Sequence, residues 1–98
     1  MSAPRAITVV AHWQMPEAAV PEVLKLVATA RQHSLAETGC LGYEVFHSVD
    51  DAGSLLLLER YRDEAAIEAH RQSLHYRELV AARIVPLLTS RQVELLHA

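Results

Sequence analysis

The stretch Ser54–Tyr61, SLLLLERY, decides the fold of this chain, because it predicts a strand that is apolar on both faces. Successive side chains of a strand point to opposite faces. One face carries two leucines, an acid and a phenol, namely Leu55, Leu57, Glu59 and Tyr61. The opposite face begins with Leu56 and Leu58. A strand of this kind is typical of a sheet that is covered on both sides.

The segments on either side of this strand predict the order β-α-β-β-α-β, with the second helical part divided in two. The expected strands lie at residues 7–14, 41–48, 54–61 and 91–96. The expected helices lie at residues 20–35, 64–71 and about 74–85. Gly39 is expected to stop the first helix in the left-handed conformation that suits glycine. This order predicts an α+β, ferredoxin-like fold with an antiparallel sheet and helices on one face.

Helices on one face leave the other face of the sheet, with Leu56 or Leu58, without cover. The simplest cover is a second copy of the sheet, so we expect a homodimer with the two sheets face to face and Trp13 packed at the interface. A hydrophobic content of 51% points the same way, because it exceeds what a small two-layer domain needs on its inward faces.

Length and composition narrow the possible functions. A chain of 98 residues is expected to form one domain, residues 1–98. A net charge of −3 without a basic stripe argues against nucleic acid, and one cysteine, Cys40, excludes a disulfide framework within the chain. No apolar run approaches the roughly 18 residues of a membrane span, and the start lacks the pattern of a signal peptide. We therefore expect a cytoplasmic protein without a membrane partner.

Several side chains that carry chemistry are expected in a cleft between sheet and helices. If the register and faces of the first and third strands agree, His12 lies near Glu59. Spacings of four and seven residues put Val80 and Arg83 on one helical face with Tyr76. The cleft would then collect His12, Glu59, Tyr61, His70 and Tyr76. Each also has a structural alternative, such as an ion pair with a neighbouring arginine for Glu59 or a helix cap for His70.

No metal site is expected, because His70 and His75 are five residues apart and would not share a helical face. His75 precedes a predicted helix, where it is expected to be exposed. The sequence also lacks a glycine-rich phosphate loop and a Gly-x-Ser-x-Gly elbow. Any chemistry is therefore expected to come from histidine, glutamate and tyrosine side chains in an apolar pocket.

Several short motifs give the chain a resemblance to a known family. Residues 37–43, Glu-Thr-Gly-Cys-Leu-Gly-Tyr, are similar to an E-x-G-C-x-x-Y turn, and residues 69–76 are similar to A-H-x-x-S-x-H-F. Together with Glu59-Arg60-Tyr61, they resemble the antibiotic biosynthesis monooxygenase family of dimeric α+β barrel proteins. That family often has Trp at the position of Tyr61 and Phe at the position of Tyr76. The resemblance covers nearly the whole chain and implies the same fold and sheet-to-sheet dimer.

The resemblance implies a cofactor-free monooxygenase that acts on a small phenolic, quinol or polyketide-like substrate with O₂. Histidine is the natural base, since its unperturbed pKa is about 6.5. His70 is expected to act as base or orienter, and Glu59 to orient a histidine. The expected substrate-binding side chains are His12, Tyr61, His75, Tyr76 and Arg83.

Two alternatives stay open. The stretch from His70 to Tyr76 is also similar to isomerases that process a small phosphorylated autoinducer sugar, for which Arg83 would supply a cationic subsite. The other alternative is a protein that binds a small ligand without turnover. A haem-degrading activity is disfavoured, because Val80 stands where that branch of the family is expected to carry its haem-ligating histidine.

Overall fold

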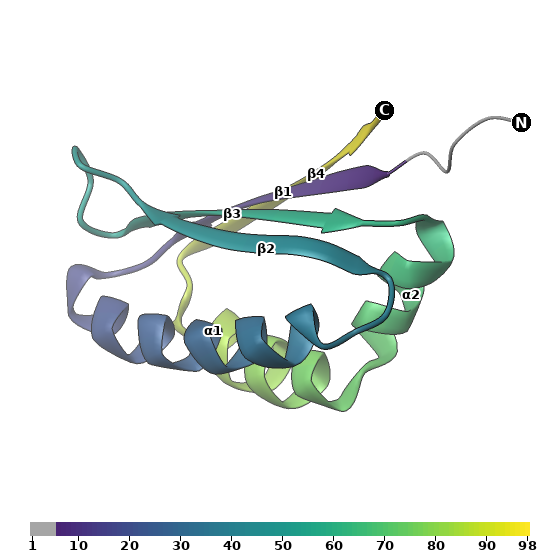
Figure 1. Cartoon of the computed structure of the whole chain (residues 1–98). Helices are drawn as coiled ribbons and strands as arrows, with labels where there is room; N and C mark the ends of the chain where they lie inside the picture. Colours follow the sequence, from purple (N-terminus) through teal and green to yellow (C-terminus); the bar gives the residue numbers. More distant parts are fainter. Residues whose placement is uncertain (1–5) are drawn as a thin grey trace, which may run out of the picture.

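The computed structural model describes residues 6–98, in which four antiparallel strands form one sheet in the order β2-β3-β1-β4 (Figure 1). The strands are β1 (Ile7–Gln14), β2 (Cys40–His47), β3 (Ser54–Tyr61) and β4 (Ser90–His97). The longer helices are α1 (Val20–Leu35) and α2 (Glu64–Gln72), followed by a π-helical segment, η2 (Tyr76–Ile84). Two short 3₁₀ turns are η1 (Glu17–Ala19) and η3 (Val85–Leu87). The predicted α+β, ferredoxin-like fold is confirmed.

All helical segments pack on one face of the sheet (Figure 1). β3 gives this face its core, because Leu55 and Leu57 are fully buried there. Trp13 of β1 lies on the same side and is only 2% exposed, so the expectation that it packs between two copies is wrong. The opposite face of the sheet, called the open face below, includes Leu56 and Leu58, and Leu56 is 37% exposed. The alternation of β3 therefore divides the strand between a core and an uncovered surface.

Local chemistry explains where the helices begin. Pro21 stands in the first turn of α1, where its missing N–H is not needed. Asp63 caps α2, since its carboxylate accepts a hydrogen bond from the Ala66 backbone N–H at 2.9 Å. The first-turn proline of α1 and the Asp63 cap of α2 both agree with the predicted helix starts.

Gly39 is required for a different reason from the one expected. No residue of the described chain has a positive φ, so Gly39 is not in the left-handed conformation. A Cβ built on Gly39 would lie 2.3 Å from Cβ of Ala66, which is closer than two carbon atoms can approach. Gly39 thus lets the chain before β2 pass close against α2, which brings Glu37 near the end of that helix.

The segment after α2 winds more widely than the predicted α-helix. Its N-terminus is held by Ser73, whose hydroxyl accepts from the Tyr76 backbone N–H at 3.3 Å. At the other end the Val85 N–H bonds to the Val80 carbonyl, five residues earlier. This winding turns Val80 and Ile84 into the core. Such π-helical windings are uncommon and occur frequently at functional sites.

Within residues 6–98, no helix has the length and apolar character required to cross a membrane.

Candidate functional site

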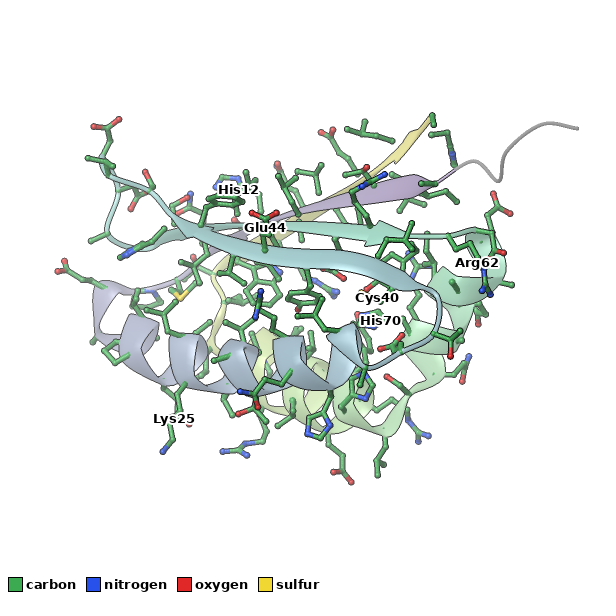
Figure 2. The ribbon with its side chains drawn as sticks, viewed as in Figure 1. His12, Lys25, Cys40, Glu44, Arg62 and His70 are labelled. Carbon is green, nitrogen blue, oxygen red and sulfur yellow. The ribbon has the colours of Figure 1, made fainter. Side chains whose placement is uncertain are left out.

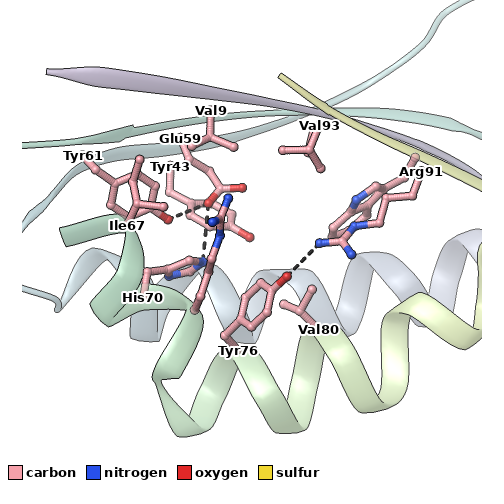
Figure 3. A pocket seen from close by; sticks show the side chains of 13 residues that line it. Val9, Tyr43, Glu59, Tyr61, Ile67, His70, Tyr76, Val80, Arg91 and Val93 are labelled. Atoms are coloured by element: carbon pink, nitrogen blue, oxygen red, sulfur yellow. Dashed lines mark hydrogen bonds and ion pairs between the residues drawn. The ribbon is translucent and has the colours of Figure 1, made fainter. Parts of the chain in front are cut away.

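A cavity of about 290 Å³ lies between the sheet and the helical layer (Figure 3). Most of its wall is aliphatic or aromatic, from Val9, Ala11, Trp13, Tyr43, Tyr61, Ile67, Tyr76, Val80 and Val93. Four acidic or basic side chains complete the wall, namely Glu59, His70, Arg71 and Arg91. A mostly apolar cavity with a few polar groups that converge on it is the usual form of a small-molecule site.

Glu59 is the acid of this cavity. It follows Leu57 on the core face of β3 and is 7% exposed. The Tyr61 hydroxyl donates a hydrogen bond of 2.6 Å to its carboxylate. Burial raises the pKa of Glu59 above its ordinary value, although the Tyr61 bond and the nearby His70 act in the opposite direction. Glu59 therefore retains a proton to higher pH than an exposed glutamate does.

His70 lies between two carboxylates. Its Nδ1 is 2.9 Å from Oε2 of Glu37, and its Nε2 is 3.6 Å from Oε1 of Glu59. The ring is buried between aromatic neighbours, with the centroids of Tyr61 and Tyr76 each 5.1 Å away. Nε2 thus faces Glu59 in the cavity, while Nδ1 is bound to Glu37 on the side away from the cavity. This arrangement can accept a proton on the cavity side and stabilise the resulting charge.

Glu37 was given no role from sequence, yet it organises the back of the site. Besides His70, its Oε2 contacts Nε2 of His75 at 2.6 Å, and the ring of His75 stacks on His33 at 5.5 Å. His75 therefore lies behind His70, outside the cavity wall, rather than against a bound substrate. The only sequence signal for Glu37 was its place in the E-x-G-C-x-x-Y motif.

Glu37, His70 and His75 also form a group of residue types that can bind a metal ion. Glu37, His70 and His75 each bring a possible ligand atom within 4.8 Å of the others. The expectation that spacing keeps the two histidines apart is wrong, because α2 ends at Gln72 and the chain then turns back. Hydrogen bonds of 2.9 and 2.6 Å already join the three groups. These bonds account for the cluster without a cation.

Two predicted members of the cleft lie elsewhere. Figure 2 shows His12 on the open face and His70 between the sheet and the helices. The register explains this, since His12 pairs with Leu56 while Glu59 pairs with Val9. His12 instead lies 2.7 Å from the Ser54 hydroxyl. The expected approach of His12 to Glu59 is therefore wrong.

Arg83 is also outside the cavity. Its guanidinium is exposed and lies 3.7 Å from a carboxylate oxygen of Glu22 on α1. The prediction assumed α-helical spacing after Tyr76, but the wider winding of η2 puts Val80 and Ile84 inward and Arg83 toward α1. The predicted cationic subsite at Arg83 is thus wrong, whereas the predicted places of Tyr61 and Tyr76 in the wall agree with the structure.

Among the wall residues whose side chains carry polar atoms, four were not predicted for the cavity: Trp13, Tyr43, Arg71 and Arg91. Arg91 donates a hydrogen bond of 2.7 Å to the Tyr76 hydroxyl (Figure 3). Trp13 and Tyr43 are buried, and the indole N–H of Trp13 has no hydrogen-bond partner within residues 6–98. The alternation of β1 and β2 could have indicated that Trp13 and Tyr43 face the core. The sequence did not indicate which part of the core is open as a cavity.

Replacing Glu59 with glutamine is expected to change how stability depends on pH. Between the ordinary glutamate pKa near 4.5 and the raised pKa of Glu59, the folded protein holds a proton that the unfolded chain has lost. The unfolding free energy of the wild type should therefore fall, relative to Glu59→Gln, as pH rises through this window. Urea titrations at stepped pH measure the difference, and Glu17→Gln, an exposed acid, controls for the lost charge. A constant difference would contradict the assignment.

Comparison with known proteins gives the chain its family. The sequence model of the family described as antibiotic biosynthesis monooxygenase matches residues 6–82. YcnE of Bacillus subtilis (strain 168), named as a candidate monooxygenase, is 35% identical over 60 residues, which are 61% of this chain and 63% of YcnE. The candidate monooxygenase Rv0793 of Mycobacterium tuberculosis is 49% identical over 41 residues, which are 42% of this chain and 40% of Rv0793. The chain thus matches less than two thirds of the length of either relative.

The similarity to solved structures covers more of this chain than the similarity to the two relatives does. The structure of Rv0793 superposes with a TM-score of 0.86 at 33% identity, covering 93% of this chain and 92% of that one. A crystal structure described as an antibiotic biosynthesis monooxygenase superposes with a TM-score of 0.87 at 27% identity, covering 94% and 97%. The resemblance drawn from the short motifs is confirmed: the chain belongs to the antibiotic biosynthesis monooxygenase family.

Proposed function

We propose that this protein is a cofactor-independent monooxygenase that oxidises a small phenol or hydroquinone with O₂. Membership of the family and two relatives named as candidate monooxygenases support an oxygenase. The observation that carries the proposal is the position of His70, held between Glu37 and Glu59 at the wall of a mostly apolar cavity.

His70 is the base in this proposal. Its Nδ1–H donates to Glu37, which leaves Nε2 as the proton acceptor on the cavity side. An orienting carboxylate of this kind fixes the tautomer of a catalytic imidazole and stabilises the imidazolium that forms. Glu59, on the other side of the ring, adds to that stabilisation. The phenolic proton therefore moves to His70 as the substrate becomes an electron-rich anion.

The tyrosines in the wall are suited to donate hydrogen bonds rather than to accept a proton. Burial raises the pKa of Tyr61 and of Tyr43 well above the ordinary value, and the neighbouring Glu59 raises both further. Both phenols therefore keep their protons at neutral pH. Histidine and glutamate are left as the proton acceptors of the cavity.

The reaction with O₂ needs no external reductant. The substrate anion passes one electron to O₂, and the substrate radical and superoxide combine to form a C–O bond. The proton on His70 returns to the peroxide that has formed. The C–H bond at the oxygenated carbon then breaks together with the O–O bond, which leaves a carbonyl on the ring, and the outer oxygen atom leaves as water with this second proton. For a hydroquinone the sum is hydroquinone plus O₂ to hydroxybenzoquinone plus water, and the hydroquinone supplies all four electrons. The aliphatic and aromatic side chains that form most of the wall favour this sequence, because they reduce the contact of the reactive anion with water.

We further propose that two copies pair through the open faces of their sheets. Apolar side chains from all four strands lie on this face, namely Val10, Phe46, Leu56, Leu58 and Leu96. Their alternation places them opposite the helical layer, where nothing within residues 6–98 covers them.

Oxygen uptake tests the proposed activity. Metal-stripped protein is supplied with a series of hydroquinones and polycyclic phenols, and O₂ is followed with an electrode while the product is identified by mass. Uptake with one oxygen atom added to the substrate supports the proposal. Absence of uptake across the series by folded protein would reject it.

An isomerase that acts on a phosphorylated sugar is the second candidate, and one observation favours it. Arg71 and Arg91 line the cavity and could bind a phosphate. An isomerase would work equally well without O₂, so anaerobic turnover separates the two functions.

A further inference from the structure

The cavity has chemically different ends. Figure 3 shows Tyr61, Glu59 and His70 toward one end and Arg91 toward the other, with Tyr76 between them. The first end offers proton acceptors and the second a guanidinium. A ligand that spans the cavity therefore meets groups of opposite chemistry.

Arg91 is not neutralised by an ion pair. Within residues 6–98 it has no carboxylate within 4.0 Å, and neither does Arg71, the second arginine of the wall. The arginines of the cavity wall thus keep their charge free for a ligand.

Arg91 is nevertheless held in place. Its Nη2 donates a hydrogen bond of 2.7 Å to the Tyr76 hydroxyl, a neutral acceptor on the opposite layer of the fold. The remaining guanidinium N–H groups are available, and a guanidinium binds carboxylate or phosphate oxygens in pairs. A partly fixed arginine loses less conformational entropy when it binds such a group.

We propose that the substrate is an anion whose carboxylate or phosphate binds Arg91, while its phenolic hydroxyl faces Glu59 and His70. The assignment of the phenolic end rests on the proposed function. A cavity of about 290 Å³ lies at the lower limit of small-molecule pockets, which restricts the substrate to about one aromatic ring. The substrate class is therefore a small hydroxylated aromatic acid or its phosphorylated counterpart.

A bound anion would also change the electrostatic environment of Glu59. Arg91 acts on Glu59 across the cavity, because its positive charge lowers the pKa of that acid against the larger effect of burial. A bound anion offsets Arg91, so less positive charge then acts on Glu59.

Anaerobic binding separates this inference from the proposed reaction. Titration calorimetry without O₂ compares hydroquinone with gentisate, its carboxylated analogue, and with hydroquinone monophosphate. We expect at least one anion to bind roughly tenfold or more tightly than hydroquinone, because hydrogen bonds to charged groups are the stronger ones. Arg91→Gln should remove that preference, whereas Arg83→Gln, an arginine paired outside the cavity, should keep it. The preference should also weaken as salt is added.

Each outcome bears on one claim. A preference for gentisate identifies a carboxylate, and a preference for the monophosphate identifies a phosphate and adds weight to the isomerase. Equal binding of neutral and anionic probes, or a preference that survives Arg91→Gln, would overturn the inference. Should Arg91→Gln fail to fold, the salt dependence of the wild type still decides the matter. If anions bind but no O₂ is consumed, only the proposed function is rejected. If O₂ is consumed with hydroquinone but anions bind no more tightly, only the present inference is rejected.

Discussion

Replacing His70 with glutamine is expected to lower kcat for O₂ uptake by about 10²–10⁴-fold, the usual contribution of general base catalysis. Glutamine keeps a polar group between Glu37 and Glu59 but has no nitrogen that accepts a proton at neutral pH. The cavity wall is otherwise retained, so binding of the substrate without O₂ should change much less than turnover. Initial rates at an oxygen electrode, with anaerobic calorimetry for binding, measure the two effects separately.

The control is His97→Gln, which removes an exposed histidine of β4. It should keep the rate of the wild type. If His70→Gln folds, binds substrate and still consumes O₂ at the rate of this control, His70 is not the base. Glu59, the other proton acceptor of the cavity, would then take its place.

Glu37→Gln separates the group that accepts the proton from the group that positions it. Glu37 holds Nδ1 of His70 at 2.9 Å but is not part of the cavity wall. We therefore expect kcat to fall by roughly 10- to 100-fold with KM little changed, and ¹⁵N NMR to report a changed tautomer balance for His70. A fall in kcat without any change in the His70 spectrum would contradict the positioning role.

The fold could be predicted because its signals are local. Turn residues, the Asp63 cap and the alternation of SLLLLERY each depend on neighbours in the chain, and the structure keeps their predicted positions within one or two residues. The division of β3 is an example, since Leu55 and Leu57 are fully buried while Leu56 is 37% exposed. Alternation alone sets this division once one face is covered.

The candidate site could be predicted only in part, because its geometry depends on long-range relations. His12 and Glu59 lie on neighbouring strands, but the pairing of Val9 with Glu59 puts His12 on the opposite face. Both faces of β3 are apolar, so the sequence did not show which of them lies on the same side of the sheet as the core face of β1. Glu37 reaches His70 across 33 residues, a contact that no spacing rule indicates.

The winding of η2 is a separate cause of error. Spacings of four and seven residues share a face in an α-helix, and this rule put Arg83 with Tyr76. The bond from Val85 to Val80 spans five residues, so each turn holds more residues and Arg83 points to Glu22. The cations of the cavity come instead from α2, at Arg71, and from β4, at Arg91, neither of which was predicted to face the cleft.

Placing a charge on the open face is expected to separate the proposed dimer into monomers. Leu56→Asp and Leu58→Asp each place a carboxylate in the middle of the proposed sheet-to-sheet interface. An unpaired buried charge costs about 3–5 kcal/mol, so the dimer should weaken by roughly two orders of magnitude or more. Both leucines lie on the face away from the helical layer, so the fold of the protomer should survive.

Val49→Asp is the matched control, because it adds the same charge at an apolar residue that is 99% exposed outside the strands. Light scattering over a range of concentrations should give a dimer for the wild type and for Val49→Asp, and monomers for both leucine variants. Circular dichroism distinguishes a folded monomer from an unfolded chain. If both leucine variants keep the mass of the control, the copies do not pair through this face. The apolar side chains of β4 on the helical side, Val93 and Leu95, each 43% exposed, would then be the next surface to test.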